Sequence, residues 1–104
     1  MSFSLIISDE AKEHLKKHRK AGSIIILKKI DRILNELRET PFEGIGHPEP
    51  LKYGRIGQWS RRIDQKHRII YEVFENQVLV EVISVFGHYN DKYSLIFFNN
   101  LLIH

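Results

Sequence analysis

Residues 57–86 read GQWSRRIDQKHRIIYEVFENQVLVEVISVF, and apolar side chains recur in this stretch at a spacing of two. That period is typical of β-strands that bury one face in a core. The sequence predicts three strands, at residues 57–64, 67–75 and 78–86. Only two residues separate each strand from the next, so we expect the three to form an antiparallel meander.

The first of two predicted helices begins at Asp9. Ser8 is a suitable N-cap, and Asp9 and Glu10 place acidic groups in the first turn, where the helix dipole favours them. Gly22 suits the position after the last turn. The apolar stripe of this helix is thin, so we expect the helix to lie mostly in water.

A second helix is predicted between Ser23, a candidate N-cap, and Pro41, which cannot continue a helix. Apolar side chains recur within it three and four residues apart. They are Ile26, Leu27, Ile30, Ile33, Leu34 and Leu37. A single Gly-Ser turn joins the two helices, which should therefore form a helical hairpin.

The apolar run FSLII at residues 3–7 adds a short strand before the helices. The predicted order is β-α-α-β-β-β, with a long connection between the second helix and the meander. The simplest way to bury the helical stripe is to pack the hairpin on one face of a mainly antiparallel sheet. The predicted fold class is therefore α+β.

The composition limits the class of protein. A chain of 104 residues fits one small domain, and the absence of cysteine excludes disulfides and thiolate metal sites. The N-terminus lacks the pattern of a signal peptide, and no apolar run approaches the ~18 residues that a membrane span needs. We expect a cytoplasmic protein that uses no cofactor.

Basic residues cluster in one part of the chain. The net charge is only +3, but six basic residues and one acid lie between residues 52 and 68. The basic residues are Lys52, Arg55, Arg61, Arg62, Lys66 and Arg68. A local basic patch is typical of surfaces that bind phosphate, so it favours a nucleic-acid partner.

The basic patch begins within an unusual connection. Residues 41–62 hold all three prolines and four of the six glycines. Proline reduces the freedom of the chain, and long loops in compact domains are usually functional or disordered. We interpret the connection as a rigid functional loop beside the open face of the sheet.

The residue types around this loop suit the cleavage of RNA. Glu49 lies between two prolines, Lys52 follows it, Arg68 begins a predicted strand, and His88 follows the last strand. A base would take the proton of a 2′-hydroxyl, a cation would stabilise the phosphorane, and an acid would protonate the leaving 5′-oxygen. No metal is needed, because the RNA supplies the nucleophile.

Four segments together resemble a known family. TPFEGIGHPEPLK, GQWSRRI, KHRIIYEV and GHY are similar, in order and spacing, to the YoeB (Txe) toxins of the RelE superfamily. The resemblance covers roughly residues 3–89. It implies a small α+β domain that acts as a ribosome-dependent messenger-RNA endonuclease. It also implies a YefM-type antitoxin and a homodimer.

The resemblance also implies roles for single residues. Glu49 would be the general base, Arg68 the group that stabilises the phosphorane, and His88 the general acid. The implied substrate-binding residues are Lys52, Arg62 and Tyr89. The chain departs from the family at its end, where the apolar segment NDKYSLIFFNNLLIH extends the domain of residues 1–89 over residues 90–104. This extension could pack on the domain, pair with a sheet edge, mediate self-association, fray, or crowd the site.

Simpler interpretations exist for several of these residues. Glu49 could accept hydrogen bonds from its own loop, and His88 could be a satisfied histidine at a sheet edge. Trp59 and Tyr71 are expected in the core rather than as base-stacking platforms. His14 and His18 are spaced like a metal-binding pair on a helix, but with no third ligand evident we expect a solvated face. The three arginines could form a salt-bridged or solvated face; they are Arg61, Arg62 and Arg68.

Three other functions remain open at this point. The chain could be a catalytically inactive module of the same fold that binds RNA or the ribosome. It could be a structural partner in a toxin–antitoxin repressor complex. A ribosome-independent ribonuclease is the third alternative.

Overall fold

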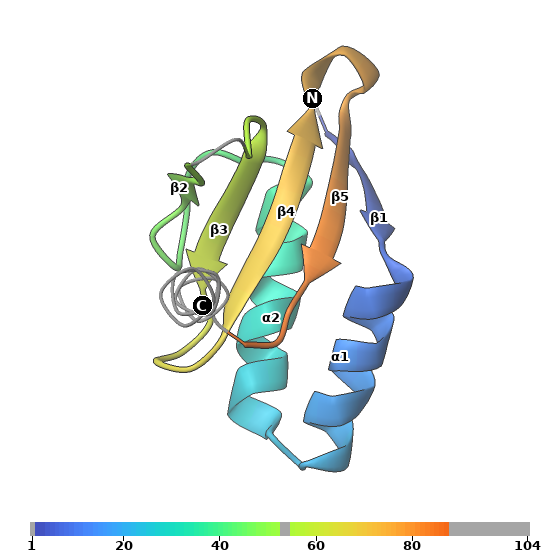
Figure 1. Cartoon of the computed structure of the whole chain (residues 1–104), viewed down its shortest axis with the longest axis vertical. Coiled ribbons are helices and arrows are strands. Elements are labelled where there is room, and N and C mark those ends of the chain that lie inside the picture. Colours follow the sequence, from blue (N-terminus) through green and yellow to red (C-terminus); the bar gives the residue numbers. More distant parts are fainter. Residues whose placement is uncertain (1, 53–54, 88–104) are drawn as a thin grey trace, which may run out of the picture.

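The computed structural model describes residues 2–52 and 55–87, and these residues form helices and strands in the predicted order (Figure 1). The predicted extension at residues 90–104 and the predicted site residues His88 and Tyr89 lie outside the described residues. The elements are β1 (Ser4–Ile7), α1 (Asp9–Lys20), α2 (Ile24–Leu37), β2 (Glu49–Pro50), β3 (Gln58–Arg62), β4 (Arg68–Phe74), a 3-10 turn (Glu75–Gln77) and β5 (Leu79–Ser84).

The described strands form one five-stranded sheet in the order β1-β5-β4-β3-β2. The predicted meander is confirmed, because β3 pairs with β4, and β4 with β5, in antiparallel register. β1 pairs in parallel with β5, with Ser4 opposite Leu79 and Ile7 opposite Val82. The α+β fold class is therefore confirmed, and the strand nearest the N-terminus closes one edge of the sheet.

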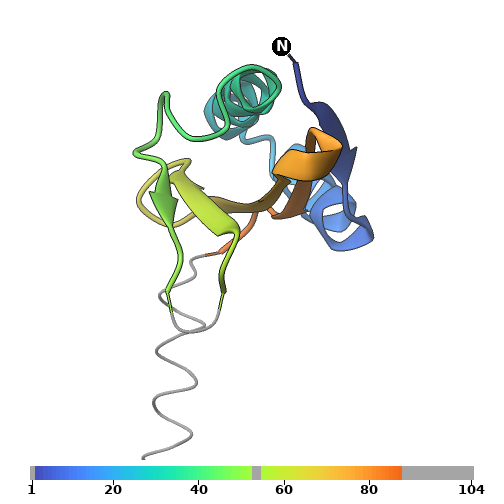
Figure 2. The same cartoon turned by 90° about the horizontal axis from the view of Figure 1, so that it is seen from above.

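The long connection contains a strand that the sequence analysis did not predict. In β2, Glu49 lies opposite Ser60 and Pro50 opposite Trp59, so β2 forms the other edge of the sheet. Proline is tolerated on an edge strand because one side of that strand needs no partner. A strand of two residues has no period, which is why the pattern of the sequence did not reveal it. Figure 2 shows the chain on either side of residues 53–54 projecting away from the sheet.

The start of α1 follows the prediction, and the start of α2 does not. The Ser8 hydroxyl accepts the Ala11 N–H at 3.0 Å and donates to the Ile83 carbonyl at 2.8 Å, so one side chain caps α1 and binds it to β5. Ser23 was expected to cap α2, but its side chain makes no capping hydrogen bond. Its N–H instead donates to the His18 carbonyl at 3.1 Å, because Ser23 belongs to the C-terminal turn of α1.

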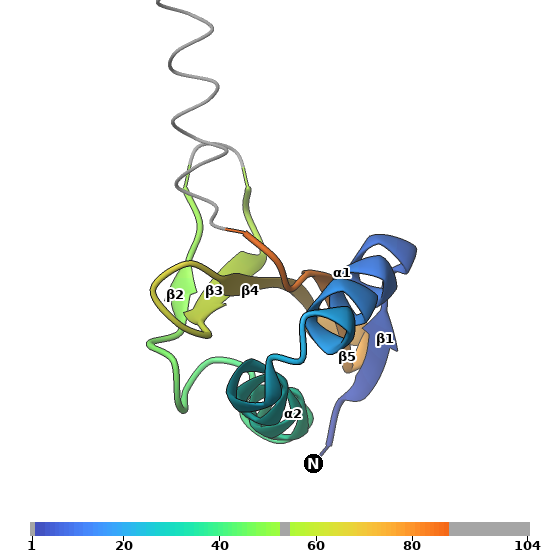
Figure 3. The same cartoon turned by 90° about the horizontal axis from the view of Figure 1, so that it is seen from below.

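Both helices cover the same face of the sheet (Figure 3). Ile30, Ile33 and Leu37 of α2 are buried among side chains of β4 and β5, and each contributes about 1.5–3 kcal/mol through burial. The expectation that α1 lies mostly in water is only partly correct, since Ala11 and His18 are buried. Neither helix among the described residues is long and apolar enough to cross a membrane.

Candidate functional site

Glu49 and Arg68 meet on the face of the sheet that the helices leave uncovered. Glu49 lies on the edge strand β2, and Arg68 is the first residue of β4, two strands away. Arg68 Nη1 lies 3.4 Å from Glu49 Oε1. The structure therefore brings together a carboxylate and a guanidinium that are 19 residues apart in the chain.

Ser60 completes this contact from the strand between them. It lies opposite Glu49 in the β2–β3 register, and its hydroxyl is 3.5 Å from Arg68 Nη1. Ser60 was not among the site residues predicted from the sequence. The signal was present in the alternation of β3, because side chains at successive strand positions point to opposite faces. Ser60 and Arg62 therefore share one face, while Trp59 and Arg61 share the other.

The two charged groups differ in their access to solvent. The Arg68 side chain is 8% exposed and the Glu49 side chain 50% exposed. Burial fixes the guanidinium in one place, whereas the carboxylate can reach a molecule that approaches from solvent. This is the arrangement expected of a fixed cation beside an accessible base.

The predicted substrate-binding residues lie near this pair to different degrees. Arg62 is exposed and lies directly opposite Arg68 in the β3–β4 register, so it belongs to the same face. Lys52 is exposed and follows β2 on the projecting segment. His88 and Tyr89 lie outside the described residues, which end at Gly87.

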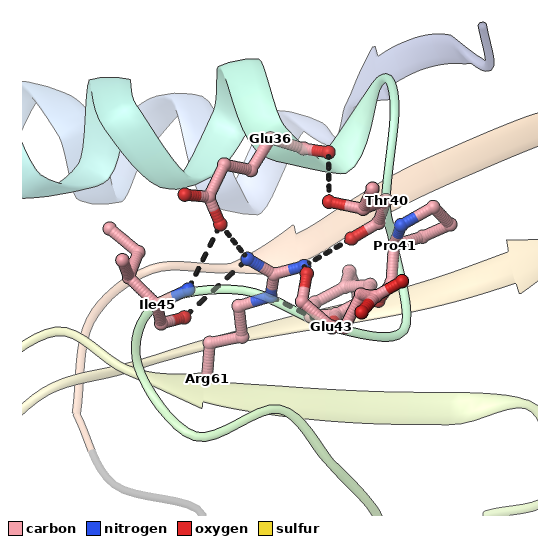
Figure 4. A network of polar contacts seen from close by, with 7 residues as sticks. Glu36, Thr40, Pro41, Glu43, Ile45 and Arg61 are labelled. Atoms are coloured by element: carbon pink, nitrogen blue, oxygen red, sulfur yellow. Dashed lines mark hydrogen bonds and ion pairs between the residues drawn. The ribbon is translucent and has the colours of Figure 1, made fainter.

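Arg61 does not belong to the phosphate-binding patch in which the sequence analysis placed it. Its side chain is fully buried on the helix-covered side of β3, where Nη1 binds Glu36 Oε1 at 2.7 Å (Figure 4). Nη2 donates to the carbonyl groups of Thr40 and Glu43 at 2.6 and 2.9 Å. Arg61 thus joins α2 to the start of the long loop and is unavailable to a ligand.

Tyr71 of β4 extends this network. Its hydroxyl donates to the Pro41 carbonyl at 2.7 Å and accepts the Arg61 Nε–H at 3.2 Å. Burial raises the pKa of this hydroxyl, although the hydrogen bond and charge of Arg61 act in the opposite direction. Tyr71 is fully buried, which confirms its predicted place in the core, while Trp59 is partly buried against the same core.

Two glycines allow the loop to approach β3 and α2 closely. A Cβ on Gly46 would lie 2.7 Å from the Arg62 carbonyl oxygen, and the Gly46 φ of +84° is unfavourable for other residues. A Cβ on Gly44 would overlap the Glu36 carboxylate. Because Arg62 N–H also donates to the Gly46 carbonyl at 2.6 Å, the loop is bonded to β3 just before it reaches Glu49.

The expected solvated face of His14 and His18 is wrong. Both imidazoles bind the backbone of Val85 beyond β5, and His18 is 2% exposed. Among residues 2–52 and 55–87, no three histidine or acidic side chains are grouped as a metal ion would require.

Comparison with known proteins adds an independent finding. A family model for the YoeB-like toxin of bacterial type II toxin–antitoxin systems matches residues 8–89. Toxin YoeB from Escherichia coli O6:H1 (strain CFT073) is 51% identical over 55 residues, which are 53% of this chain and 66% of that relative. The aligned part thus spans just under two thirds of the length of that relative.

Solved structures are similar over most of the chain. The YoeB dimer from Staphylococcus aureus has a TM-score of 0.73 and 33% identity, and the match covers 86% of this chain and 100% of that one. The toxin chain matched in the heterotetrameric YoeB–YefM complex from Staphylococcus aureus has a TM-score of 0.70 and 32% identity, with the same coverage.

Proposed function

The chain belongs to the YoeB-like toxins of bacterial type II toxin–antitoxin systems, and on this premise we propose that it is an endoribonuclease that cleaves messenger RNA in the ribosomal A site. The observation that carries the proposal is the 3.4 Å contact between the Glu49 carboxylate and the Arg68 guanidinium on the sheet face that the helices leave uncovered. The reaction needs a base and a fixed cation on that face, and the two groups proposed for these roles are adjacent.

Three side chains would each have one role in the reaction. Glu49 takes the proton of the 2′-hydroxyl, and the 2′-oxygen attacks the adjacent phosphorus. Arg68 stabilises the additional negative charge of the phosphorane, and His88 gives a proton to the leaving 5′-oxygen. The products are a 2′,3′-cyclic phosphate and a free 5′-hydroxyl, so protons and charge balance. Ser60 orients the guanidinium through its contact with Nη1.

The remaining basic residues would bind the RNA backbone. Arg62 lies beside Arg68, and Lys52 extends from the end of β2, so the two flank the Glu49–Arg68 pair. Phosphate contacts of this kind position RNA without reading its sequence. Tyr89 would stack on a base or orient the scissile phosphate. The ribosome would hold the codon in a cleavable geometry, which lets a small protein act with little binding energy of its own.

An antitoxin would block this face. The related Staphylococcus aureus protein forms a complex with YefM, and we extend a YefM-type partner to this chain. A disordered segment that folds over the exposed Arg62 and Lys52 would neutralise both RNA binding and catalysis. A homodimer is proposed on the same basis, since the Staphylococcus aureus YoeB structure is a dimer.

Primer extension on messenger RNA in a translating extract tests the proposal. Wild type should produce a new cut within the A-site codon. Glu49→Gln and His88→Ala should each lower the cleavage rate about 10²- to 10⁴-fold, because each removes one proton-transfer group. Naked RNA of the same sequence should be cut far more slowly, since the ribosome supplies the geometry.

Glu43→Gln is the matched control. Glu43 is an exposed carboxylate of the same loop, and only its backbone carbonyl takes part in the contacts described. This variant should cut at the wild-type rate. A stalled ribosome without a cut, unchanged by Glu49→Gln, would instead identify an inactive binding module. Equal rates on naked and ribosome-bound RNA would identify a ribosome-independent ribonuclease.

A further inference from the structure

Three histidines surround the chain where it leaves the sheet. β5 ends at Ser84, so the backbone groups of Val85 need partners outside the sheet. His14 Nδ1 accepts the Val85 N–H at 3.2 Å, and His18 Nε2 binds the Val85 carbonyl at 2.9 Å. Two histidines one turn apart on α1 therefore hold both polar backbone groups of one residue.

The third histidine holds Gly87 in the same way. His67 Nδ1 accepts the Gly87 N–H at 2.9 Å, while the Arg68 N–H donates to the Gly87 carbonyl at 2.8 Å. The local structure that presents His67 is a turn in which Asp64 accepts the His67 N–H at 2.7 Å. The dipeptide His67-Arg68 thus binds both sides of Gly87.

The exposed Phe86 ring lies against all three of these histidines. Its ring centroid lies 5.8, 5.1 and 4.6 Å from those of His14, His18 and His67, and Lys17 Nζ lies 4.9 Å above the ring. We use the name histidine clamp for His14, His18 and His67 around residues 85–87.

The hydrogen bonds define the protonation states that the histidine clamp needs. An imidazole nitrogen that accepts an N–H bond cannot carry a proton, so His14 and His67 must be neutral with a bare Nδ1. His18 binds a carbonyl and must donate, which both its neutral and its charged forms can do. Protonation of His14 or His67 would therefore place an imidazole N–H opposite a backbone N–H, and the hydrogen bond between them would be lost.

We propose that the histidine clamp positions the chain that leads into His88, and that it opens when His14 and His67 are protonated. His88 follows Gly87 directly in the sequence, so the bonds to Gly87 hold the last described residue before the proposed general acid. They also tie that point to the backbone of Arg68, the proposed stabiliser of the phosphorane. This role in catalysis rests on the proposed function, whereas the clamp itself does not.

The charged groups around each histidine are consistent with this switch. His14 Nε2 faces Glu10 at 3.6 Å. Burial lowers the pKa of His67 below its ordinary value of 6.5, and the charges of His18 and Lys66 lower it further, whereas Asp64 raises it. His67 is therefore neutral at neutral pH and accepts the Gly87 N–H there. Lys17, above Phe86, adds a further positive charge beside the clamp.

Amide hydrogen exchange on the full chain, measured by NMR, tests the histidine clamp without reference to catalysis. In wild type, the protection of the Val85 and Gly87 amides should fall between about pH 8 and about pH 5, after correction for intrinsic exchange. His67→Asn keeps an acceptor near the place of Nδ1 but cannot titrate, so Gly87 should stay protected at both pH values. His67→Phe keeps a ring against Phe86 without an acceptor, so Gly87 should be unprotected at both.

His47→Asn is the control for the loss of a histidine. His47 is exposed in the long loop with a φ of 55°, which asparagine tolerates, and the Gly87 response should match wild type. Protection of Gly87 that does not change with pH in wild type would overturn the switch. Protection that persists in folded His67→Phe would overturn the clamp.

Kinetics on ribosome-bound RNA connect the clamp to catalysis. His67→Phe should lower kcat about ten- to a hundredfold with little change in KM, because it misplaces a catalytic group without removing an RNA contact. His67→Asn should restore most of kcat and flatten the acidic limb of its pH profile. If wild type itself does not cut RNA, the proposed function is wrong, and the exchange data alone show whether the histidine clamp exists. A His67→Phe kcat equal to wild type would refute the positioning role.

Discussion

The two adjacent arginines of β3 have different surroundings. Arg61 is fully buried and binds Glu36, three loop carbonyl groups and Tyr71, whereas Arg62 is exposed beside Arg68. The alternation of a strand places the two side chains on opposite faces. Residue type alone therefore does not say which of the two arginines is available to a ligand, and the face of the strand does.

Substituting each arginine in turn separates stability from function. Arg61→Met should reduce the free energy of unfolding by about 3–5 kcal/mol, because Glu36 and the loop carbonyl groups lose a buried partner. Arg62→Met should change it by less than about 0.5 kcal/mol but should slow RNA cleavage. Urea denaturation gives the first quantity and primer extension the second. Equal destabilisation by both variants would contradict the assignment.

The sequence predicted one contact of the candidate site at this scale. Glu49 and Arg68 were selected from residue type and resemblance, and the structure places them in contact. Ser60 was not predicted although the alternation of β3 places it on the face of Arg62, and the burial of Arg61 was not predicted because it depends on the position of α2. Alternation distinguishes Arg61 from Arg62, but it does not say which face α2 covers, and Glu36 binds the arginine on that face.

At the scale of elements, hydrogen bonds hold the long loop against the rest of the domain. The loop is bound to α2 and β4 at its start and to β3 at Gly46, so it delivers β2 to the edge of the sheet. The periodic helices and strands were predicted because each shows a clear pattern. β2 and the parallel pairing of β1 were not, because two residues carry no period and strand order depends on the whole chain.

A pair of glycine variants tests the close approach of the loop. Gly46→Ala should destabilise the protein by several kcal/mol and slow cleavage, because it adds a backbone clash to the strain of a positive φ. Gly22→Ala, at φ +68° with no atom within 4 Å of the added Cβ, should cost only about 1 kcal/mol. Thermal unfolding measures the loss of stability in both variants. Similar losses in the two variants would show that strain alone, without the clash, explains the effect.

For the whole molecule, the histidine clamp predicts how stability depends on pH. The pKa of His67 is lower in the folded chain than its ordinary value of 6.5, so folding favours the neutral form. Its contribution to stability is complete above about pH 6.5, and it is lost as the pH falls through the lower pKa that His67 has in the folded chain. The stability of wild type relative to His67→Asn should therefore decrease on acidification. A difference that is constant from neutral to acidic pH would exclude this linkage, and His47→Asn provides the baseline.

The parallel pair of β1 and β5 determines when the domain can be completed. Ser4 pairs with Leu79 and Ile7 with Val82, so β1 is synthesised well before its partner β5. Contacts so distant in sequence form late and slowly, in contrast to the β3–β4 hairpin, which can pair as soon as both strands exist. During translation, the nascent chain carries an unpaired β1 through the synthesis of every element before β5. Synthesis that stops short of residue 79 leaves β1 without its partner strand. It also leaves α1 without β5, the strand against which α1 packs.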